Sequence, residues 1–432
     1  MAPHIHTEDH GFMLSVEKAL EKILANFSTL DSMDSPTIDA LGLTLDQDIR
    51  ANFDIPPSPN SAMDGYAVRY DDVAKASRQK ATLLRVIDQI PAGSMPTKHI
   101  TKGTAARIMT GAPIPPGADT VIPFEQTDEI DRTEAGESLD SINIHFHGPQ
   151  GNHIRPQGED VQKGQLVLHR GTTLRPPHIG VLGSLGLSKV RVIRRPRVGI
   201  LSTGDELVPP GKPLPAGRIY DSNSFSLAAS VTQYGGIPEL LGIAADNIVD
   251  TERKLLNGLN CDLLLTSAGV SKGAFDLVKN VLAKHGEIQF WSVRMRPAKP
   301  LAFGLLRNSQ GGTTPHIGLP GNPVSSLVAF EQFCRPAILC MLGKTKYQKP
   351  TVRATLKEPI DNPDGRRVYA RVWVESSGTK YIATKVGPDG SNLLTSMVRA
   401  NGLAICPENI KRCDVGETVE VQMLNWDEEI EI

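Results

Sequence analysis

A strand, a glycine-bearing loop and a helix are predicted in succession over residues 262–276. Residues 263–265 are three leucines with no polar alternation, a pattern that favours a strand buried on both faces of a parallel sheet. Gly269 and Gly273 allow a tight turn, and the N–H groups that open the following helix favour an anion there. Considered alone, the loop can equally be a plain strand-to-helix connection, because glycine-rich turns are weak signals.

The same pattern recurs at two other places in the chain. Residues 196–207 contain an apolar run that ends in Ser202-Thr203-Gly204, and residues 316–326 carry Gly321-Asn322 before an apolar helical segment over 327–342. In an open α/β sheet, ligands bind at the loops that follow the carboxyl ends of strands. The alternation of strands and helices therefore predicts a doubly wound parallel sheet with right-handed crossovers and an anion site at one edge.

Charged side chains accompany these loops. Arg294, Arg296 and Lys299 lie between the last two loops in the chain, and two carboxylates, Asp205 and Glu206, follow the first. Cations, carboxylates and loops rich in N–H groups together indicate a phosphorylated ligand bound with a metal ion.

The whole chain is too long for a single hydrophobic core. Its 432 residues fit roughly two to four domains. Lys and Arg (46) nearly balance Asp and Glu (48), so the bulk charge favours neither nucleic acid nor an anionic membrane as a partner. The sequence contains no apolar run of membrane-spanning length and no apolar signal core, so we expect a cytoplasmic protein. Its five cysteines lack Cys-x-x-Cys spacing, which supports neither a disulfide framework nor a structural zinc site.

Mainly β structure is predicted on both sides of the α/β block. Short runs of branched residues over 81–147 predict a small β domain, and similar runs over 351–423 predict a C-terminal β module. Apolar residues at helical spacing over 12–27 predict an amphipathic helix. Residues 160–175 predict strand, turn and strand, and residues 176–185 a helix.

Two loops and one histidine pair of the β domain have open interpretations. Asp64-Gly65 suits a hairpin turn, or the loop presents Ser61 and Asp64 as functional groups. The Pro- and Gly-rich loop over 107–119 either holds a site or is a plain surface turn. His145 and His147 alternate on one strand face, but no third ligand in the sequence nearby completes a metal set.

Three arginines in the C-terminal module are also ambiguous. Arg366, Arg367 and Arg371 surround one strand, and Gly390-Ser391-Asn392 follows a further turn. They are either solvated surface charges, the commoner fate of arginine, or a second anion pocket beside the α/β block.

Six motifs then occur in a fixed order: Asn60-Ser61-Ala62-Met63-Asp64-Gly65-Tyr66-Ala67, Ile108-Met109-Thr110-Gly111-Ala112, Ser202-Thr203-Gly204-Asp205-Glu206-Leu207, Ser267-Ala268-Gly269-Val270-Ser271-Lys272-Gly273 with Asp276, Arg296-Pro297-Ala298-Lys299-Pro300, and Gly318-Leu319-Pro320-Gly321-Asn322-Pro323-Val324-Ser325. In this order they resemble the molybdopterin molybdenumtransferase family, which includes MoeA and the E-domains of gephyrin and plant Cnx. The resemblance covers nearly the whole chain. Each motif alone is weak, but six in order are specific.

The resemblance implies an enzyme of molybdenum cofactor synthesis. Such an enzyme takes adenylylated molybdopterin and molybdate, releases AMP with Mg²⁺ present, and leaves molybdenum on the dithiolene sulfurs. It also implies a homodimer, with a molybdopterin adenylyltransferase and molybdenum-enzyme apoproteins as further partners. The implied architecture is a discontinuous N-terminal domain, an inserted β domain, a central molybdopterin-binding α/β domain and a C-terminal β-barrel. The corresponding ranges are residues 1–54 with 149–194, 55–148, 195–346 and 347–432.

The family's functional residues carry over onto matching positions of this sequence. Glu206 and Asp276 resemble the carboxylates that hold Mg²⁺. The positions that resemble the molybdopterin and nucleotide pocket are Ser202, Thr203, Gly204, Ser267, Gly269, Val270, Ser271, Gly321, Asn322 and Ser325. Those that resemble catalytic groups are Asp246, Arg296, Lys299, Arg371 and Ser391, together with Asp64 and Thr110, which are expected to reach the site of the other subunit.

Three positions depart from the family pattern. Ala268 and Ala298 stand where the family often has glycine, and Ser292 stands where a lysine is common. Charge is retained at Arg296 and Lys299, so the departures affect the geometry of the anion site and not the class of protein.

A different function on the same fold is a non-catalytic carrier of molybdate or cofactor, or a scaffold. Such a protein would not need a pair of metal-holding carboxylates. The presence of both Glu206 and Asp276 therefore favours the enzyme.

Overall fold

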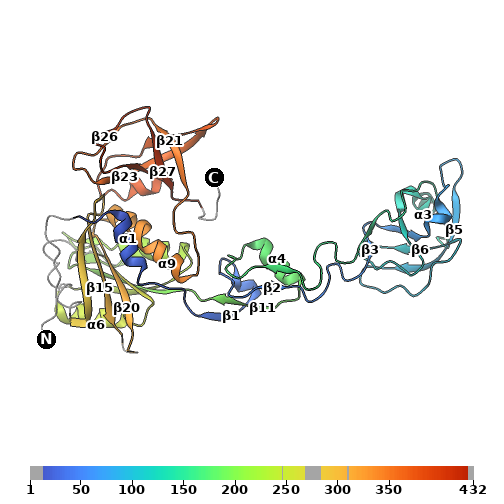
Figure 1. Cartoon of the computed structure of the whole chain (residues 1–432), viewed down its shortest axis with the longest axis horizontal. Helices are drawn as coiled ribbons and strands as arrows, with labels where there is room; N and C mark the ends of the chain where they lie inside the picture. The colour runs from blue at the N-terminus through green and yellow to red at the C-terminus, as the bar shows by residue number, and fades with distance from the viewer. Residues whose placement is uncertain (1–12, 246, 268–283, 309–310, 427–432) are drawn as a thin grey trace. The chain divides into compact units, whose positions relative to one another are not determined.

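The computed structural model describes residues 13–245, 247–267, 284–308 and 311–426 (Figure 1). The chain forms two compact units. The larger unit comprises Met1–Asp46, Gly171–Ile179 and Ser188–Ile432, and the smaller unit comprises Gln47–Arg170 and Gly180–Leu187. In sequence, the smaller unit is thus inserted into the larger one.

A six-stranded sheet forms the centre of the larger unit. Its first four strands are parallel neighbours, and its last two are antiparallel. In spatial order the strands are β15 (Ile237–Ala244), β12 (Arg197–Thr203), β16 (Leu263–Ser267), β20 (Thr313–Leu319), β19 (Pro300–Arg307) and β17 (Gly286–Ser292).

The predicted α/β class is confirmed, but the sheet is mixed and not wholly parallel. Seven residues, 293–299, connect β17 to β19, and five residues, 308–312, connect β19 to β20. A parallel crossover needs a dozen or more residues, so these two connections force antiparallel pairing.

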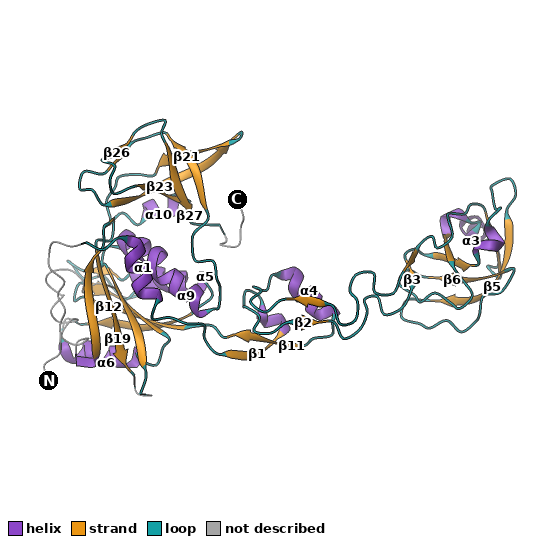
Figure 2. Ribbon diagram, viewed as in Figure 1, coloured by secondary structure: helices purple, strands orange, loops and turns teal. Residues whose placement is uncertain are grey.

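Helices cover both faces of this sheet, as the unbroken leucine run of β16 predicts. Leu263 and Leu265 pack into a core cluster with α1, α5 and α9, whereas Leu264 packs on the other face with α6. Figure 2 shows α1 and α9 on the opposite side of the strands from α6. The helices are α1 (Val16–Leu24), α5 (Asn223–Gln233), α6 (Ile248–Gly258), α8 (Pro323–Ala329), the π-helical segment η3 (Phe330–Cys334) and α9 (Arg335–Met341).

Two of these helices illustrate how sequence sets local structure. Ser15 caps α1, because its Oγ accepts a hydrogen bond from the backbone N–H of Lys18 at 3.2 Å. The continuous helical stretch Pro323–Met341 is long and apolar enough to cross a membrane, but 83% of it is buried inside the structure. It is therefore placed as a core helix of the larger unit.

The C-terminal module of the larger unit is a closed barrel. Strand β23 pairs with both β24 and β25, and the ring is completed through β21 and β27. A short strand from the α/β region, β18 (Met295–Arg296), adds in parallel to β23. The barrel elements are β21 (Thr351–Leu356), β23 (Arg367–Ser377), β24 (Lys380–Lys385), β25 (Gly402–Cys406) and β27 (Thr418–Met423), with β22 (Ile360–Asp361), β26 (Arg412–Cys413) and α10 (Thr395–Arg399).

Short elements complete the larger unit and lead into the smaller one. Strand β1 (Ser32–Pro36) pairs antiparallel with β11 (Lys189–Ile193), and β13 (Leu207–Val208) pairs in parallel with β14 (Ile219–Tyr220). The remaining elements are η1 (Thr37–Ala40) and α4 (Pro176–Ser184), the latter at the predicted position.

The smaller unit contains a five-stranded sheet in the order β7, β4, β6, β5, β8. Its predicted strands are present as β5 (Thr82–Ile90), β6 (Thr104–Ile108), β7 (Thr120–Pro123) and β8 (Ser141–Ile144), beside β4 (Gly65–Val68). The other elements are β2 (Ile49–Arg50) paired with β10 (Leu166–Leu168), β3 (Asn60–Ser61) paired with β9 (Ile154–Arg155), α2 (Tyr70–Val73), η2 (Phe124–Gln126) and α3 (Glu129–Glu134).

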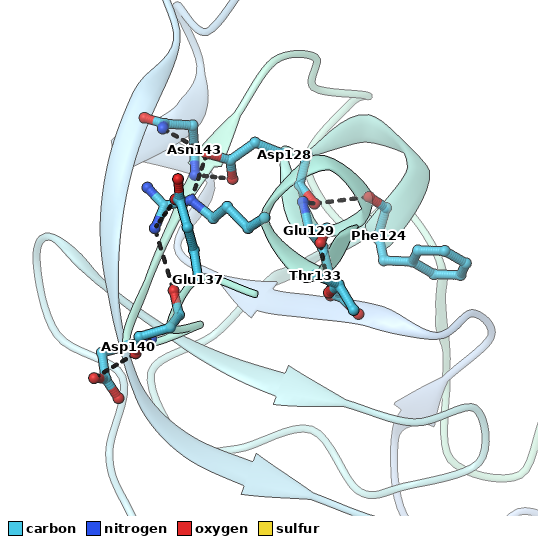
Figure 3. A network of polar contacts seen from close by, with 10 residues as sticks. Phe124, Asp128, Glu129, Thr133, Glu137, Asp140 and Asn143 are labelled. Carbon is cyan, nitrogen blue, oxygen red and sulfur yellow. Dashed lines mark hydrogen bonds and ion pairs between the residues drawn. The ribbon is translucent and has the colours of Figure 1, made fainter. Parts of the chain in front are cut away.

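Two sequence predictions for the smaller unit need correction. The segment 160–175 was expected to hold two strands, yet only β10 is one, because Gly164 and Gly171 adopt positive φ in flanking turns. Helix α3 was not predicted. Asp128 fixes its start, since it accepts hydrogen bonds from Arg132 Nε at 2.7 Å and from the backbone N–H of Asn143 at 2.8 Å (Figure 3).

Candidate functional site

Two of the three predicted anion loops, and the strand end that leads to the third, lie along one edge of the central sheet. Strands β12, β16 and β20 are parallel neighbours, and their carboxyl ends are in register, with Ser202 opposite Ser267 and Ser267 opposite Leu319. Ser202 and Ser267 are buried, while Gly321 and Asn322 are exposed on the loop after β20. The strand topology therefore brings together the loops after β12 and β20 and the carboxyl end of β16, whereas the predicted loop over 268–273 lies outside the described residues.

Residues at the start of α5 connect these loops, a contact that was not predicted from the sequence. Asn223 Nδ2 donates to Ser267 Oγ at 2.7 Å and to the carbonyl of Gly321 at 2.8 Å. Ser224 Oγ lies 2.8 Å from Ser202 Oγ. One asparagine thus ties the strand end of β16 to the loop after β20. The cluster of polar residues at the start of α5 was the available signal, but it also suits an ordinary helix cap.

Two polar atoms at this edge are left for a ligand. Thr203 Oγ1 and Asn223 Oδ1 are buried and have no hydrogen-bond partner among the described residues. A buried polar group without a partner costs about 1–3 kcal/mol, so such groups are rare in folded proteins unless something binds there.

Gly204 and Glu206 follow β12 as a local pair. Gly204 adopts φ of 143°, and a Cβ there would lie 2.4 Å from Glu206 Oε2. The positive φ favours glycine at this turn, and the exposed Glu206 carboxylate lies against it. Within the described residues, no group of three or more His, Cys, Asp or Glu side chains gathers as a metal site.

Several residues singled out in the sequence lie outside the described residues. These are Asp246, Gly269, Val270, Ser271 and Asp276.

A cavity of about 230 Å³, here named the Arg371 cavity, lies beside this edge. Four residues that the sequence analysis singled out line it, namely Arg296, Ser325, Arg371 and Ser391. Lys299 is exposed and is not one of the lining residues that the structure describes. The wall also contains residues that were not proposed as site residues: Pro297, Ala298, Arg366, Val368, Tyr369, Ala370 and Asp389.

Arg371 is fixed in this cavity by its own hydrogen bonds. It is only 4% exposed, and its guanidinium donates to Ser396 Oγ at 3.1 Å and to the carbonyl of Pro388 at 2.7 Å. Burial lowers the pKa of Arg371 from its ordinary value, while the nearby Asp389 carboxylate acts in the opposite direction. Arginine stays protonated at neutral pH despite such a shift, so the cavity contains a fixed positive charge.

The loop after β20 reaches the barrel at Ser391. Asn322 Nδ2 donates to Ser391 Oγ at 2.9 Å, and the backbone N–H of Val324 donates to the carbonyl of Ser391 at 3.0 Å. These bonds connect the polar edge of the sheet with the Arg371 cavity. The barrel arginines thus split into two groups: Arg366 and Arg371 line the cavity, whereas Arg367 pairs with Glu17 and Glu408.

In the smaller unit, Asp64 and Thr110 form a rigid pair. Asp64 Oδ1 accepts hydrogen bonds from both the backbone N–H and the Oγ1 of Thr110, each at 2.7 Å. These two bonds, the backbone one first, lower the pKa of Asp64. Arg107 supports the neighbouring turn, since Nη1 donates to the carbonyl of Gly65 at 3.3 Å. Ser61 is buried, so it is not presented as its loop interpretation required.

Comparisons with known proteins show which protein family has this architecture. Family models match three segments: "MoeA N-terminal region (domain I and II)" over residues 14–186, "probable molybdopterin binding domain" over 199–339, and "MoeA C-terminal region (domain IV)" over 353–424. The molybdopterin molybdenumtransferase 2 of Mycobacterium tuberculosis is 37% identical over 400 residues, which are 91% of this chain and 94% of that protein. The chain belongs to the molybdopterin molybdenumtransferase family.

Further relatives agree with this assignment. The molybdopterin molybdenumtransferase of Haemophilus influenzae is 36% identical over 385 residues, covering 88% of this chain and 90% of that protein. Two solved structures of a molybdopterin biosynthesis MoeA protein from Pyrococcus horikoshii align with TM-scores of 0.78 and 0.74 at 31% and 30% identity. They cover 96% and 95% of this chain and 100% of each solved chain. The family is one of molybdenum cofactor biosynthesis.

The molybdopterin molybdenumtransferase resemblance makes Ala298 conspicuous, because it stands where glycine is common. Ala298 adopts φ of 74°, is 5% exposed and lines the Arg371 cavity. A left-handed conformation costs a residue with a Cβ about 1 kcal/mol relative to glycine. This chain therefore retains the backbone shape that suits glycine while placing a methyl group in the wall.

Replacing Ala298 by glycine is expected to leave the free energy of unfolding within about 0.5 kcal/mol of the parent, or to raise it, because relief of the left-handed strain offsets the lost methyl burial. The matched control is Ala19→Gly, which changes a fully buried alanine inside α1 and is expected to cost at least about 1 kcal/mol. Urea denaturation of both variants measures the difference. Equal losses in the two variants would refute the strain at Ala298.

Proposed function

We propose that this protein is a molybdopterin molybdenumtransferase that inserts molybdenum from molybdate into adenylylated molybdopterin and releases AMP. The observation that carries the proposal is the Arg371 cavity, where Arg296, Arg371, Ser325 and Ser391 gather beside the loop after β20. Molybdate is a tetrahedral dianion, and such an oxyanion is bound by arginine forks and hydroxyl donors. The neighbouring edge of the sheet supplies N–H groups and hydroxyls suited to the pterin phosphate and the nucleotide.

In the proposed reaction, water attacks the phosphorus of the adenylyl group, the phosphoanhydride bond breaks, and AMP separates from molybdopterin phosphate. One oxygen ligand of molybdate leaves as water with the two dithiol protons, and the two dithiolene sulfurs bind molybdenum in its place. The protein contributes mainly by positioning the two substrates and by stabilising their negative charge. Arg371 holds a fixed positive charge in the cavity, and Asn223 orients Ser267 and the loop at Gly321.

We assign Mg²⁺ to Glu206 together with Asp276. Mg²⁺ prefers carboxylate and phosphate oxygens, and when bound it would offset the charge of the phosphates. Glu206 fits this assignment because its carboxylate is exposed beside Gly204 at the carboxyl end of β12.

The test of the function is AMP release from adenylylated molybdopterin by purified protein, with and without molybdate. Release that depends on molybdate supports the proposal, and tight substrate binding without release would instead indicate a non-catalytic carrier.

Glu206→Gln is expected to raise the Mg²⁺ concentration needed for half-maximal release at least about tenfold, since one anionic ligand is lost. The matched control is Asp205→Asn, an exposed neighbour on the same turn, which should leave the Mg²⁺ requirement unchanged.

We propose further that the protein acts as a homodimer in which Asp64 and Thr110 complete the site of the other subunit. Asp64 is half-buried, and its pairing with Thr110 holds the carboxylate in one orientation. In this arrangement, Asp64→Ala and Arg371→Ala subunits are each nearly inactive at the molybdate concentration that half-saturates the parent, but a mixed dimer contains one complete site.

Mixing the two nearly inactive variants after dissociation is therefore expected to restore about a quarter of the parental AMP release, as random pairing of two subunit types predicts. Mixing Arg371→Ala with Ser391→Ala subunits is the control, because both changes remove the same cavity from the larger unit. Recovery in the control, or none in the first mixture, would contradict the shared site.

The proposed cellular setting follows from the substrate. A molybdopterin adenylyltransferase would supply the adenylylated compound, and apoproteins of molybdenum enzymes would receive the product. We place the protein in the cytoplasm.

A further inference from the structure

A second cavity in the larger unit is larger than the Arg371 cavity, at about 460 Å³, and shares no lining residue with it. It lies where the carboxyl ends of α5 and α9 meet the segments before α4 and after β27. Its lining residues are Leu41, Gly42, Thr173, Leu174, Arg175, Pro176, Arg195, Thr232, Gln233, Tyr234, Gly235, Leu339, Lys344, Lys349, Asn425 and Trp426. We name it the Lys349 cavity.

Its wall is cationic. Arg175, Arg195, Lys344 and Lys349 line it, and no Asp or Glu is among its described lining residues. Arg195 donates only to carbonyls in the hydrogen bonds of the described residues, those of Gly235 at 3.2 Å and Leu41 at 3.3 Å. The side chains of Arg175 and Lys344 have no hydrogen bond or ion pair with any described residue. Arg175, Arg195 and Lys344 thus have no carboxylate partner among the described residues.

Lys349 forms the buried floor. Its side chain is 2% exposed, and Nζ donates to Tyr234 Oη at 2.7 Å and to the carbonyl of Leu424 at 3.1 Å; it also lies 3.7 Å from the buried Glu331 carboxylate, which offsets its charge. Tyr234 and Trp426 add aromatic surface to the wall. Lys349 therefore shapes the floor of the cavity, while Arg175, Arg195 and Lys344 supply the positive charge that an anionic ligand would meet.

We propose that the Lys349 cavity binds a phosphorylated small molecule, separately from the proposed transferase site. The volume lies within the usual range for small-molecule pockets. Arginine forks and lysine ammonium groups together suit a multiply charged phosphate, and the two aromatic rings provide a face for an apolar or planar part of the same ligand.

Titration calorimetry with inorganic pyrophosphate tests this proposal on the full chain. All variants carry Arg371→Ala, which weakens binding in the Arg371 cavity, and any binding at the neighbouring sheet edge is common to all of them. Adding Arg175→Gln with Lys344→Gln is expected to weaken pyrophosphate binding at least about tenfold. The matched control adds Arg353→Gln with Lys380→Gln, two exposed cations of the barrel, and should not alter binding. Equal affinities in the two variants would overturn the proposal.

Two further measurements distinguish the Lys349 cavity from the transferase site and from a docking site for the chain's own C-terminal residues. Arg175→Gln with Lys344→Gln in the parental background should leave AMP release without pyrophosphate unchanged, so failure of the transferase proposal and failure of this one are distinguishable. Residues 427–432, Asp-Glu-Glu-Ile-Glu-Ile, follow Trp426 directly and are acidic. If pyrophosphate binds only to a chain ending at Trp426, the cavity belongs to that segment and the proposal is wrong.

Discussion

Replacing Arg371 by alanine is expected to raise the molybdate concentration for half-maximal AMP release roughly 100-fold, with the affinity for the nucleotide little changed. The guanidinium is the most buried charge of the Arg371 cavity, at 4% exposure, so solvent cannot replace it. The expected loss combines the missing cation with displacement of Ser391, because Arg371 holds the carbonyls of Pro388 and Gly390 just before it.

Two variants separate charge from geometry at Arg371. Arg371→Lys keeps the charge but loses the fork, so its molybdate requirement should lie between the parent and Arg371→Ala. Arg353→Ala, on an exposed position of the same barrel, is the control for a lost arginine. An unchanged molybdate requirement in Arg371→Ala would remove this residue from the anion site. The variant is also expected to lose about 1–3 kcal/mol of stability, which urea denaturation measures independently.

Local sequence patterns predict the helices and strands of this fold where the packing of the side chains favours the same structure. The strands Thr351–Leu356 and Thr418–Met423 form the two ends of the predicted β module over 351–423, because alternating branched residues such as Val352 and Val421 face the barrel core. Helix α3 (Glu129–Glu134) has a single apolar residue, Ile130, and so lacks a helical pattern. It forms because Asp128 joins Arg132 to Asn143 on a neighbouring strand, a contact that only the folded structure supplies.

The candidate site also has parts that the local sequence predicts and parts that depend on the folded structure. The three loops at Gly204, Ser267 and Gly321 were predictable, since each follows an apolar strand and parallel strands end at one edge. The role of Asn223 was not, because it depends on where α5 meets two loops that lie 44 and 98 residues further along the chain. The closed barrel likewise decides which arginines line the cavity, Arg366 and Arg371, and which forms ion pairs, Arg367.

The largest expected effect on stability comes from Glu331. Its carboxylate, 12% exposed, lies 3.3 Å from Arg335 Nε and 3.7 Å from Lys349 Nζ, and it accepts a hydrogen bond from Tyr234 Oη at 2.9 Å. Glu331→Gln removes the negative charge shared by two buried cations. Leaving a buried charge without its partner costs roughly 3–5 kcal/mol, so we expect a loss of that size in the free energy of unfolding.

Urea denaturation checks this loss against Glu420→Gln, an exposed glutamate on β27 whose change should stay within about 0.5 kcal/mol. A double variant, Glu331→Gln with Lys349→Met, tests the cause. Removing one of the stranded cations should recover part of the loss, because the penalty comes from the unpaired charge and not from the missing carboxylate. If the double variant instead loses as much stability as the two single variants combined, the loss comes from packing, and the explanation by an unpaired buried charge is wrong.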